Sequence, residues 1–241
     1  MLDVSVVLPA HNEAQRLQFC VEKVKQTLDE LDCKYEIIIA EDGSSDGTDA
    51  IAKDLAKRNG FRSLHSPSKL GRGRALKTAF AIARGKTLVY MDIDLATDLK
   101  HFAELLEHAK THDVVTGSRY ADGAKTKRPP LRRLVSKVYN LLIRIMLGCN
   151  IKDAQCGFKA FSRRFSKEVI ENINEKSWAW DTIVLVEAIK HGYKFKEFPV
   201  DWVEKKNKFT SVKRIFKDTR LHGLALVKLF LKWRLNKKVR V

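Results

Sequence analysis

Short apolar runs alternate with amphipathic stretches through the first half of the chain, and this alternation constrains the fold more than any other feature. Residues 4–8 and 35–40 are continuous, β-branched runs, as in strands that are buried on both faces. Between them, apolar residues recur every three or four positions, which is the spacing of one helix face: Leu17, Val21, Val24, Leu28 and Leu31. Strand, helix and strand in this order predict a βαβ unit.

The same alternation continues to residue 116. It predicts helices over 46–58, 72–84 and 98–110, and strands near Phe61, over 87–91 and over 113–116. We therefore expect an α/β fold with a mostly parallel, doubly wound sheet flanked by helices. Such sheets bind ligands at the carboxyl ends of their strands.

Positive charge is concentrated in the second half of the chain. The net charge is +17, yet residues 1–110 carry 16 Lys and Arg against 17 Asp and Glu, whereas residues 111–241 carry 30 against 12. A basic half of this kind predicts attraction to phosphate groups, whether in nucleic acid, anionic lipid or a phosphorylated substrate.

The cysteines and the N-terminus indicate a reducing compartment. The four cysteines form no CxxC pair and show no metal-ligand spacing with the histidines. The N-terminal MLDVSVVLPAHNE lacks the basic region and the length of a signal peptide. No apolar stretch approaches the roughly 18 residues of a transmembrane helix. We expect a cytoplasmic protein with neither signal peptide nor transmembrane segment, peripheral on the cytosolic face of a membrane.

Two amphipathic helices are predicted after the Lys-, Gly- and Pro-rich segment 121–130. In 131–147 one stripe contains Leu131, Leu134, Val135, Val138, Leu141, Leu142, Ile145 and Met146. A last helix over about 221–235 is also apolar on one side and interrupted by cations. These helices either lie on a membrane surface, or pack on the sheet or on each other. We expect a domain over 1–210, which includes 131–147, and a basic helical extension over 211–241.

Two acids one residue apart end the strand 87–91. Alternation points Asp92 and Asp94 the same way, so their carboxylates can hold Mg²⁺ or Mn²⁺ while a diphosphate completes the shell. Solvated acids at a strand end are the alternative. A second acidic strand end, Glu41-Asp42, falls on the same edge of the predicted sheet and favours the metal site. The nearby Asp46 is expected to cap the next helix.

Two further segments reach the same edge. Residues 8–13, LPAHNE, close the first strand, and Asn12 is as well explained by a helix cap as by a functional role. Residues 69–74, KLGRGR, combine glycines with cations at a helix start, which suits contact with a diphosphate. A solvated basic loop is the alternative for this segment.

In sequence order, these segments resemble the motifs of family 2 glycosyltransferases of the GT-A, Rossmann-like fold, in particular the dolichyl-phosphate mannose and glucose synthases. The resemblance is carried by VVLPAHNE, AEDGSSDGT, LGRGRALKTAF, YMDIDLAT and GSRY. The later DAQCGFKAF, WAWDTIVLVEA and VDWVE are most similar to the glucosyl branch. Ala96 stands where the mannose synthases often have Gln, and residues 205–213 are rich in Lys rather than Arg. Both departures disfavour GDP-mannose as donor.

The resemblance implies an inverting transfer from a nucleotide sugar, with UDP-glucose favoured, to dolichyl or another polyprenyl phosphate. Together with the glycine and cation loop, it gives as donor-binding residues Pro9, His11, Glu13, Ala40, Asp42, Gly71, Arg74, Asp92, Ile93 and Asp94. The metal ligands would be Asp92 and Asp94. The acceptor phosphate would meet Arg119, Arg133, Lys137, Ser211 and Lys213. The catalytic set would be Asp94, Arg119, Arg133 and Asp181.

A lipid phosphate is already an anion, so arginines that orient it matter more than a general base. One rival hypothesis is a transferase that acts on a saccharide or protein hydroxyl, with Asp181 as the base. A second rival is a nucleic-acid-binding module. It explains the basic half of the chain but not the acids at the strand ends, and we expect no nucleic-acid partner.

Overall fold

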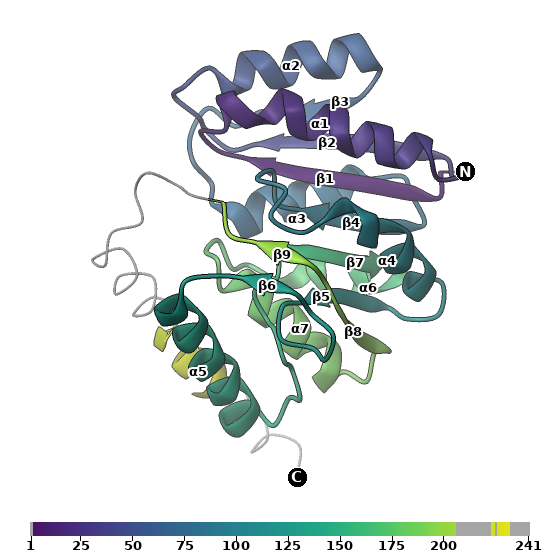
Figure 1. Cartoon of the computed structure of the whole chain (residues 1–241). Coiled ribbons are helices and arrows are strands. Elements are labelled where there is room, and N and C mark those ends of the chain that lie inside the picture. Colours follow the sequence, from purple (N-terminus) through teal and green to yellow (C-terminus); the bar gives the residue numbers. More distant parts are fainter. Residues whose placement is uncertain (1, 206–222, 225, 232–241) are drawn as a thin grey trace.

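The computed structural model describes residues 2–205, 223–224 and 226–231. In this part of the chain, seven strands form one sheet in the order β3-β2-β1-β4-β7-β5-β8 (Figure 1). They are β1 (Val4–Ala10), β2 (Tyr35–Glu41), β3 (Arg62–Leu64), β4 (Thr87–Met91), β5 (Val114–Ser118), β7 (Phe158–Ser162) and β8 (Phe195–Pro199). Within it, β7 runs antiparallel to both of its neighbours. The prediction of a mostly parallel α/β sheet is confirmed.

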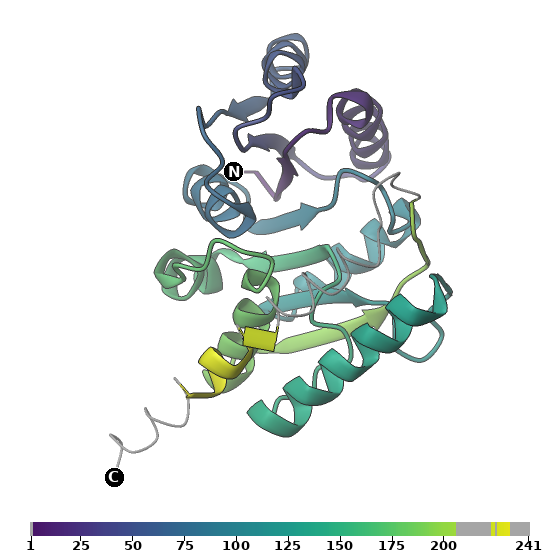
Figure 2. The ribbon, with the colours of Figure 1, turned by 90° about the vertical axis from the view of Figure 1, so that its left-hand side faces the viewer.

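Helices cover both faces of the sheet (Figure 2). One face carries α1 (Ala14–Asp29), α2 (Thr48–Asn59) and α4 (Phe102–Ala109), which follows the 3₁₀ turn η1 (Leu99–His101). The other carries α3 (Arg72–Ile82), α6 (Arg163–Glu168), the 3₁₀ turn η2 (Ile170–Asn172) and α7 (Trp180–Lys190). Four residues of the predicted α1 stripe, from Leu17 to Leu28, are fully buried, which confirms that face.

The antiparallel strand β7 was not predicted, and it determines what lies beside β4. It inserts between β4 and β5, with Lys159 opposite Tyr90 and Phe158 opposite Met91. The backbone N–H of Asp92 donates to the carbonyl of Gly157, at 3.0 Å. A segment more than 60 residues away in the sequence thus packs against the predicted metal-binding acids.

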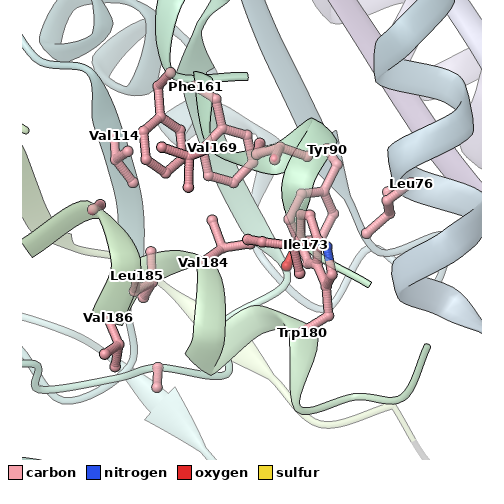
Figure 3. Close-up of a cluster of buried hydrophobic side chains, with 14 of the residues drawn as sticks. Leu76, Tyr90, Val114, Phe161, Val169, Ile173, Trp180, Val184, Leu185 and Val186 are labelled. Carbon is pink, nitrogen blue, oxygen red and sulfur yellow. The ribbon is translucent and has the colours of Figure 1, made fainter. Parts of the chain in front are cut away.

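Trp180, at the start of α7, is fully buried in an aromatic cluster (Figure 3). Its ring centroid lies 5.8 Å from that of Tyr90, 6.2 Å from Phe161 and 6.4 Å from Phe80. These contacts fix the first turn of α7 against β4 and β7. The next residue, Asp181, is consequently held beneath the end of β4.

The apolar stripe of α5 (Pro130–Leu147) faces away from the protein. The buried residues of this helix are Ser136, Tyr139, Asn140, Ile143 and Leu147. The exposed ones include Leu131, Leu134, Val138, Leu141, Leu142 and Ile145, which are 40–70% accessible. On a helix these two sets lie on opposite sides. The alternative that this stripe packs on the sheet is therefore wrong for α5.

Residues 223–224 and 226–231 are helical. Leu226 and Leu229 join the buried cluster that contains Ile143 and Leu147 of α5, whereas Leu224, Val227 and Leu231 are 46–51% exposed. The predicted domain boundary at residue 210 lies outside the described residues and stays a prediction. Within the described ranges, no helix combines the length and hydrophobicity needed to cross a bilayer.

A short parallel ribbon, β6 (Thr126–Lys127) with β9 (Trp202–Val203), lies outside the main sheet. It leads from β8 to the last described residue before the first gap, Lys205. Strand alternation places the side chains of Trp202 and Glu204 on one side of the ribbon and those of Val203 and Lys205 on the other.

Candidate active site

The ends of β1, β2 and β4 meet at one edge of the sheet. Pro9 pairs with Ala40 and Ala10 with Glu41, and the N–H of Asp42 donates to the carbonyl of Ala10, at 2.9 Å. His11 continues this contact, because its Nδ1–H donates to the carbonyl of Asp42, at 2.7 Å. The structure thus brings together the strand ends that the sequence placed on a common edge.

The loops after β1 and β2 are tied to each other. Asn12 does not cap α1; it adopts a left-handed φ of 57°, and its side-chain oxygen accepts from the N–H of Ser45, at 2.9 Å. Asp46 accepts from the N–H of Ala14 (3.2 Å) and from that of Thr48 (3.1 Å), so it serves the starts of both α1 and α2. The N-cap position of α2 is Gly47, however, so the expected cap Asp46 contacts the first turn of α2 from one residue before that position.

Asp42 anchors the glycine and cation loop. Its two carboxylate oxygens accept from the N–H groups of Leu70, at 2.6 Å, and Gly71, at 2.9 Å, and the residue is 4% exposed. Gly71 has φ +96°, and a Cβ there would stand 2.4 Å from the carbonyl oxygen of Lys176, so only glycine fits. The predicted role of Asp42 in donor binding stays a prediction.

The neighbouring Glu41 has two partners of its own. Its carboxylate accepts from the N–H of Ser44, at 2.6 Å, and lies 2.6 Å from Nδ1 of His65. Burial opposes its ionisation, but these hydrogen bonds prevail and lower the pKa of Glu41. Glu41 therefore stabilises the loop as an anion.

Asp92 and Asp94 concentrate negative charge at the end of β4. Burial raises the pKa of the Asp94 carboxyl, and the charge of Asp92 raises it further. The pKa of Glu13 is raised by burial and then by Asp94 and Asp92, although Arg16 opposes this. After the acids, Leu95 has a left-handed φ of 50°, a strained conformation for leucine. The carboxyl groups of Glu13, Asp92 and Asp94 are close enough to repel one another, which suits a cation.

The residues present fit a divalent cation that is shared with a ligand. Oxygen ligands suit Mg²⁺ and Mn²⁺. Gly157 leaves room for the Asp92 carboxylate, since a Cβ at residue 157 would lie 1.9 Å from Oδ2 of Asp92. The described part of the chain holds no cluster of three or more His, Cys, Asp or Glu side chains that could bind a metal by itself. Asp92 and Asp94 would therefore share the metal with ligand oxygens and water.

Arg72, two residues before the predicted donor-binding residue Arg74, contacts the first of these acids. The Arg72 guanidinium forms an ion pair with Oδ1 of Asp92, and its Nε lies 3.6 Å from Oδ2 of Asp181. It also lies 4.4 Å from the ring centroid of Trp178. Residues two apart on a helix point about 200° away from each other. Because α3 begins at Arg72, Arg74 is turned outward and exposed.

A fully buried lysine lies beneath this pair. Lys159 Nζ lies 2.8 Å from Oδ1 of Asp181 and donates to the hydroxyl of Tyr90, at 3.3 Å, which in turn hydrogen-bonds to Asp181. Burial raises the pKa of Asp181 to about 7 and lowers the pKa of Lys159 to about 8. The sequence signal for Lys159 was a charged residue within the apolar run FKAF, in a motif that the resemblance covers.

Arg119 is occupied by a buried partner that sequence reasoning missed. Its Nε and Nη2 donate to the two carboxylate oxygens of Asp153, each at 2.7 Å, and its backbone N–H donates to the same group at 2.9 Å. Burial disfavours both charges, but the pair outweighs it, so the pKa of Arg119 is raised and that of Asp153 is lowered. The predicted role of Arg119 at the acceptor phosphate stays a prediction, and its Nε and Nη2 already donate to Asp153.

A second group of arginines lies next to Arg119. The Arg128 Nη1 donates to the Tyr120 hydroxyl, at 3.1 Å, and to the Ser136 hydroxyl, at 2.9 Å, while its Nε lies 3.3 Å from Glu204. Arg132 pairs with the other oxygen of Glu204. The guanidinium groups of Arg119 and Arg128 stack over Trp202, at 5.2 and 5.4 Å.

The other predicted acceptor residues are placed differently. Arg133 and Lys137 are exposed on the flank of α5. Ser211 and Lys213 lie outside the described residues.

Among the predicted donor-binding residues, Ile93 is 4% exposed and belongs to the core, so only its backbone is available to a donor.

A groove of about 770 Å³ opens along the loop that follows Asp94. Its lysines are Lys23, Lys125, Lys127 and Lys205, and its apolar wall includes Phe19, Leu95 and Val203. The positive charge of Lys205 favours the ionised form of Asp94, but burial has the larger effect, so the pKa of Asp94 stays raised. The approach to the acids is therefore basic on this side.

Comparison with known proteins agrees with this geometry. The profile described as "Glycosyl transferase family 2" matches residues 5–170, a span that includes the ends of β1, β2 and β4 and all of β7. The chain belongs to this family. The match covers the acids at the end of β4, the loop that Asp42 anchors, and the Arg119–Asp153 pair.

Several family members resemble the chain over most of its length. It is 44% identical to Glycosyltransferase AglD of Haloferax volcanii over 209 residues, 85% of this chain and 34% of AglD. It is 34% identical to Dolichyl-phosphate beta-glucosyltransferase ALG5A of Trichomonas vaginalis over 214 residues, 83% of this chain and 66% of that protein. The chain thus spans about a third of the first relative and somewhat less than two thirds of the second.

Solved structures share the fold. Glucosyl-3-phosphoglycerate synthase of Mycobacterium tuberculosis in complex with UDP superposes with a TM-score of 0.70 at 20% identity, covering 95% of this chain and 80% of that one. The same enzyme with Mn²⁺, UDP-glucose and phosphoglyceric acid gives a TM-score of 0.71 at 18% identity, with 95% and 80% covered. At these identities the likeness shows the fold alone.

The Arg119–Asp153 pair predicts a large cost for removing one partner. Asp153→Ala leaves a buried guanidinium without its counter-ion, and we expect the free energy of unfolding to fall by about 3–5 kcal/mol. Asp122→Ala, which removes the exposed partner of Lys152, is the control and should cost less than about 1 kcal/mol. Urea denaturation of both variants measures the difference. Equal small losses would show that the buried pair does not hold this region together.

Proposed function

We propose that the protein is an inverting glycosyltransferase that moves a sugar from a nucleotide-sugar donor to a polyprenyl phosphate at a membrane surface. The observation that carries the proposal is the position of Asp92 and Asp94 directly after β4, at the edge where β1 and β2 also end and where Gly157 leaves room for the Asp92 carboxylate, in a family 2 chain. UDP-glucose is the favoured donor and dolichyl phosphate the favoured acceptor, because relatives are named dolichyl-phosphate beta-glucosyltransferases.

The donor lies across the ends of β1, β2 and β4 in this proposal. The loop that contains His11 and Glu13, with Pro9 and Ala40 at the strand ends, lines the nucleoside. Gly71 lets the backbone approach the diphosphate, and Asp92 and Asp94 hold Mg²⁺ or Mn²⁺ against it. A bound divalent cation supplies charge neutralisation for the diphosphate leaving group. Asp42 maintains the loop that closes over this site.

The acceptor phosphate is assigned to Arg128 and Arg132. Both guanidinium groups converge on the Glu204 carboxylate, an internal anion whose place a phosphate can take. Ser136 lies within the same hydrogen-bonded group. Arg119 does not bind the phosphate in this proposal, because its guanidinium is already paired with Asp153. It supports the two neighbouring arginines instead. Arg133 and Lys137, which the sequence suggested, face solvent on the flank of α5 and suit a surface role instead.

The environment of Asp181 favours a phosphate acceptor over a hydroxyl. A phosphate anion attacks the anomeric carbon from the side opposite the diphosphate and needs no base, which gives a β-linked product from an α-linked donor. A hydroxyl acceptor requires a base within hydrogen-bond reach. Asp181 is 3% exposed and faces Tyr90, Lys159 and Arg72. We infer that it positions Arg72.

The outward face of α5 supports the membrane assignment. Six exposed apolar residues lie opposite the buried side of the helix, and Arg133, Lys137 and Arg144 follow one border of this apolar face. A helix with such a face lies in the bilayer interface, with its cations near anionic headgroups. Leu224, Val227 and Leu231 add exposed apolar area from the C-terminal helix. We propose a peripheral position on the cytosolic leaflet.

Mass analysis of the lipid product tests the function. The protein is incubated with UDP-glucose, UDP-N-acetylglucosamine or GDP-mannose, a polyprenyl phosphate and Mn²⁺. We expect a hexose adduct of the lipid phosphate with UDP-glucose, and no adduct with Asp94→Asn. Transfer to a saccharide hydroxyl, with no lipid product from any donor, would favour the hydroxyl-acceptor rival.

The two arginines at the start of α5 give a matched pair of variants. Arg132→Gln should raise the KM for polyprenyl phosphate about tenfold or more, because a charge-assisted contact with the phosphate is lost. Arg133→Gln should change that KM less than about twofold, since Arg133 points away from Glu204. Initial rates at saturating donor measure both. The reverse order would assign the acceptor site to the exposed flank.

Membrane association should depend on the apolar face of α5. Leu134→Glu with Leu141→Glu places charges in the apolar layer, and we expect flotation with vesicles of anionic phospholipid at low salt to fall at least about fivefold. Phe19→Glu, at an apolar position on α1 that is 58% exposed, is the control and should float like the unmodified protein. Equal flotation of the double variant and the control would show that the apolar face of α5 does not contact the membrane.

A further inference from the structure

A cation of the protein already occupies one of the two metal-binding carboxylates. The guanidinium of Arg72 pairs with Oδ1 of Asp92. The side chain of Arg72 is 11% exposed and that of Asp92 is 35% exposed, so the ion pair sits below the opening and is only partly screened by water. A divalent cation that approaches Asp92 meets a fixed positive charge.

The hydrogen bonding of the Arg72 guanidinium in this position is incomplete. Its Nε is buried and, among the described residues, finds no hydrogen-bond acceptor, although Asp181 lies 3.6 Å away. The guanidinium also lies 4.4 Å from the ring centroid of Trp178 and 5.2 Å from that of Tyr90. Asp181 and the two rings can retain the cation after Asp92 is released.

We propose that Arg72 is a resident counter-ion that competes with the divalent metal for Asp92, so that metal binds strongly only together with the donor diphosphate. The proposal rests on the proposed function, which supplies a diphosphate ligand. A divalent cation bound at Asp92 is repelled by the guanidinium that already pairs with this carboxylate. The diphosphate carries enough negative charge for both, and it gives the displaced guanidinium a new partner.

Arg72 is therefore a positioning residue for the donor complex. Its positive charge balances the negative charge of the acids in the protein without ligand. It also lowers the affinity for the metal when no diphosphate is bound. Binding of metal and diphosphate becomes cooperative, because each ligand offsets the charge that opposes the other. Asp181, which is itself held by Lys159, fixes the second position of the guanidinium.

The test measures Mn²⁺ binding without nucleotide, by electron paramagnetic resonance of the free ion. Arg72→Gln should bind Mn²⁺ about tenfold more tightly than the unmodified protein, because the repulsion is removed. Arg72→Lys keeps the charge and should bind within about threefold of the unmodified protein. Arg74→Gln removes an exposed charge two residues along the same helix and should be unchanged.

Addition of UDP completes the test. UDP should tighten Mn²⁺ binding much more in the unmodified protein than in Arg72→Gln. Unchanged or weaker Mn²⁺ binding by Arg72→Gln overturns the proposal, as does an equal gain in Arg74→Gln. If Arg72→Gln does not fold, Arg72→Met keeps an unbranched chain between the rings and gives the same comparison. Failure of every variant to bind UDP would reject the donor assignment, while the Mn²⁺ measurement still decides the role of Arg72.

Discussion

The arrangement of the site depends on negative charge at the end of β4 that other elements balance. Asp92 is met by Arg72 from α3, and Asp181 is met by Lys159 from β7. Neither cation is near its partner in the sequence, so the charges are balanced only once the sheet, α3 and α7 are assembled. The aromatic cluster around Trp180 supplies that assembly (Figure 3). Packing in the core therefore determines the electrostatics of the opening.

The antiparallel strand β7 connects the donor side with the acceptor side. Gly157, the residue before β7, adjoins Asp92, and the preceding segment provides Asp153, which holds Arg119. Arg119 stacks on Trp202 beside Arg128, next to the start of α5. A single segment thus places the proposed donor and acceptor sites relative to each other. The apolar face of α5 then lies close to the acceptor region, where a lipid phosphate would have to enter.

The sequence was most informative where local pattern decides the structure. Buried strands, the face of α1 and the shared edge of Asp42, Asp92 and Asp94 all follow from periodicity and parallel connection. It was least informative where partners meet across the fold. The choice of Arg72 over Arg74 depends on the residue at which α3 begins, and the pairing of Arg119 with Asp153 depends on the insertion of β7. Periodicity located the apolar stripe of α5 but could not tell which way it faced.

The proposed function depends on Asp92 and Asp94 binding a nucleotide diphosphate through a divalent metal. Calorimetric titration with UDP is the decisive measurement, with Mn²⁺, with excess chelator, and with Asp94→Asn in Mn²⁺. We expect clear UDP binding in Mn²⁺ that is lost in chelator and in the variant, while circular dichroism shows an unchanged fold. UDP binding of equal strength in chelator would show that no metal links the diphosphate to these acids.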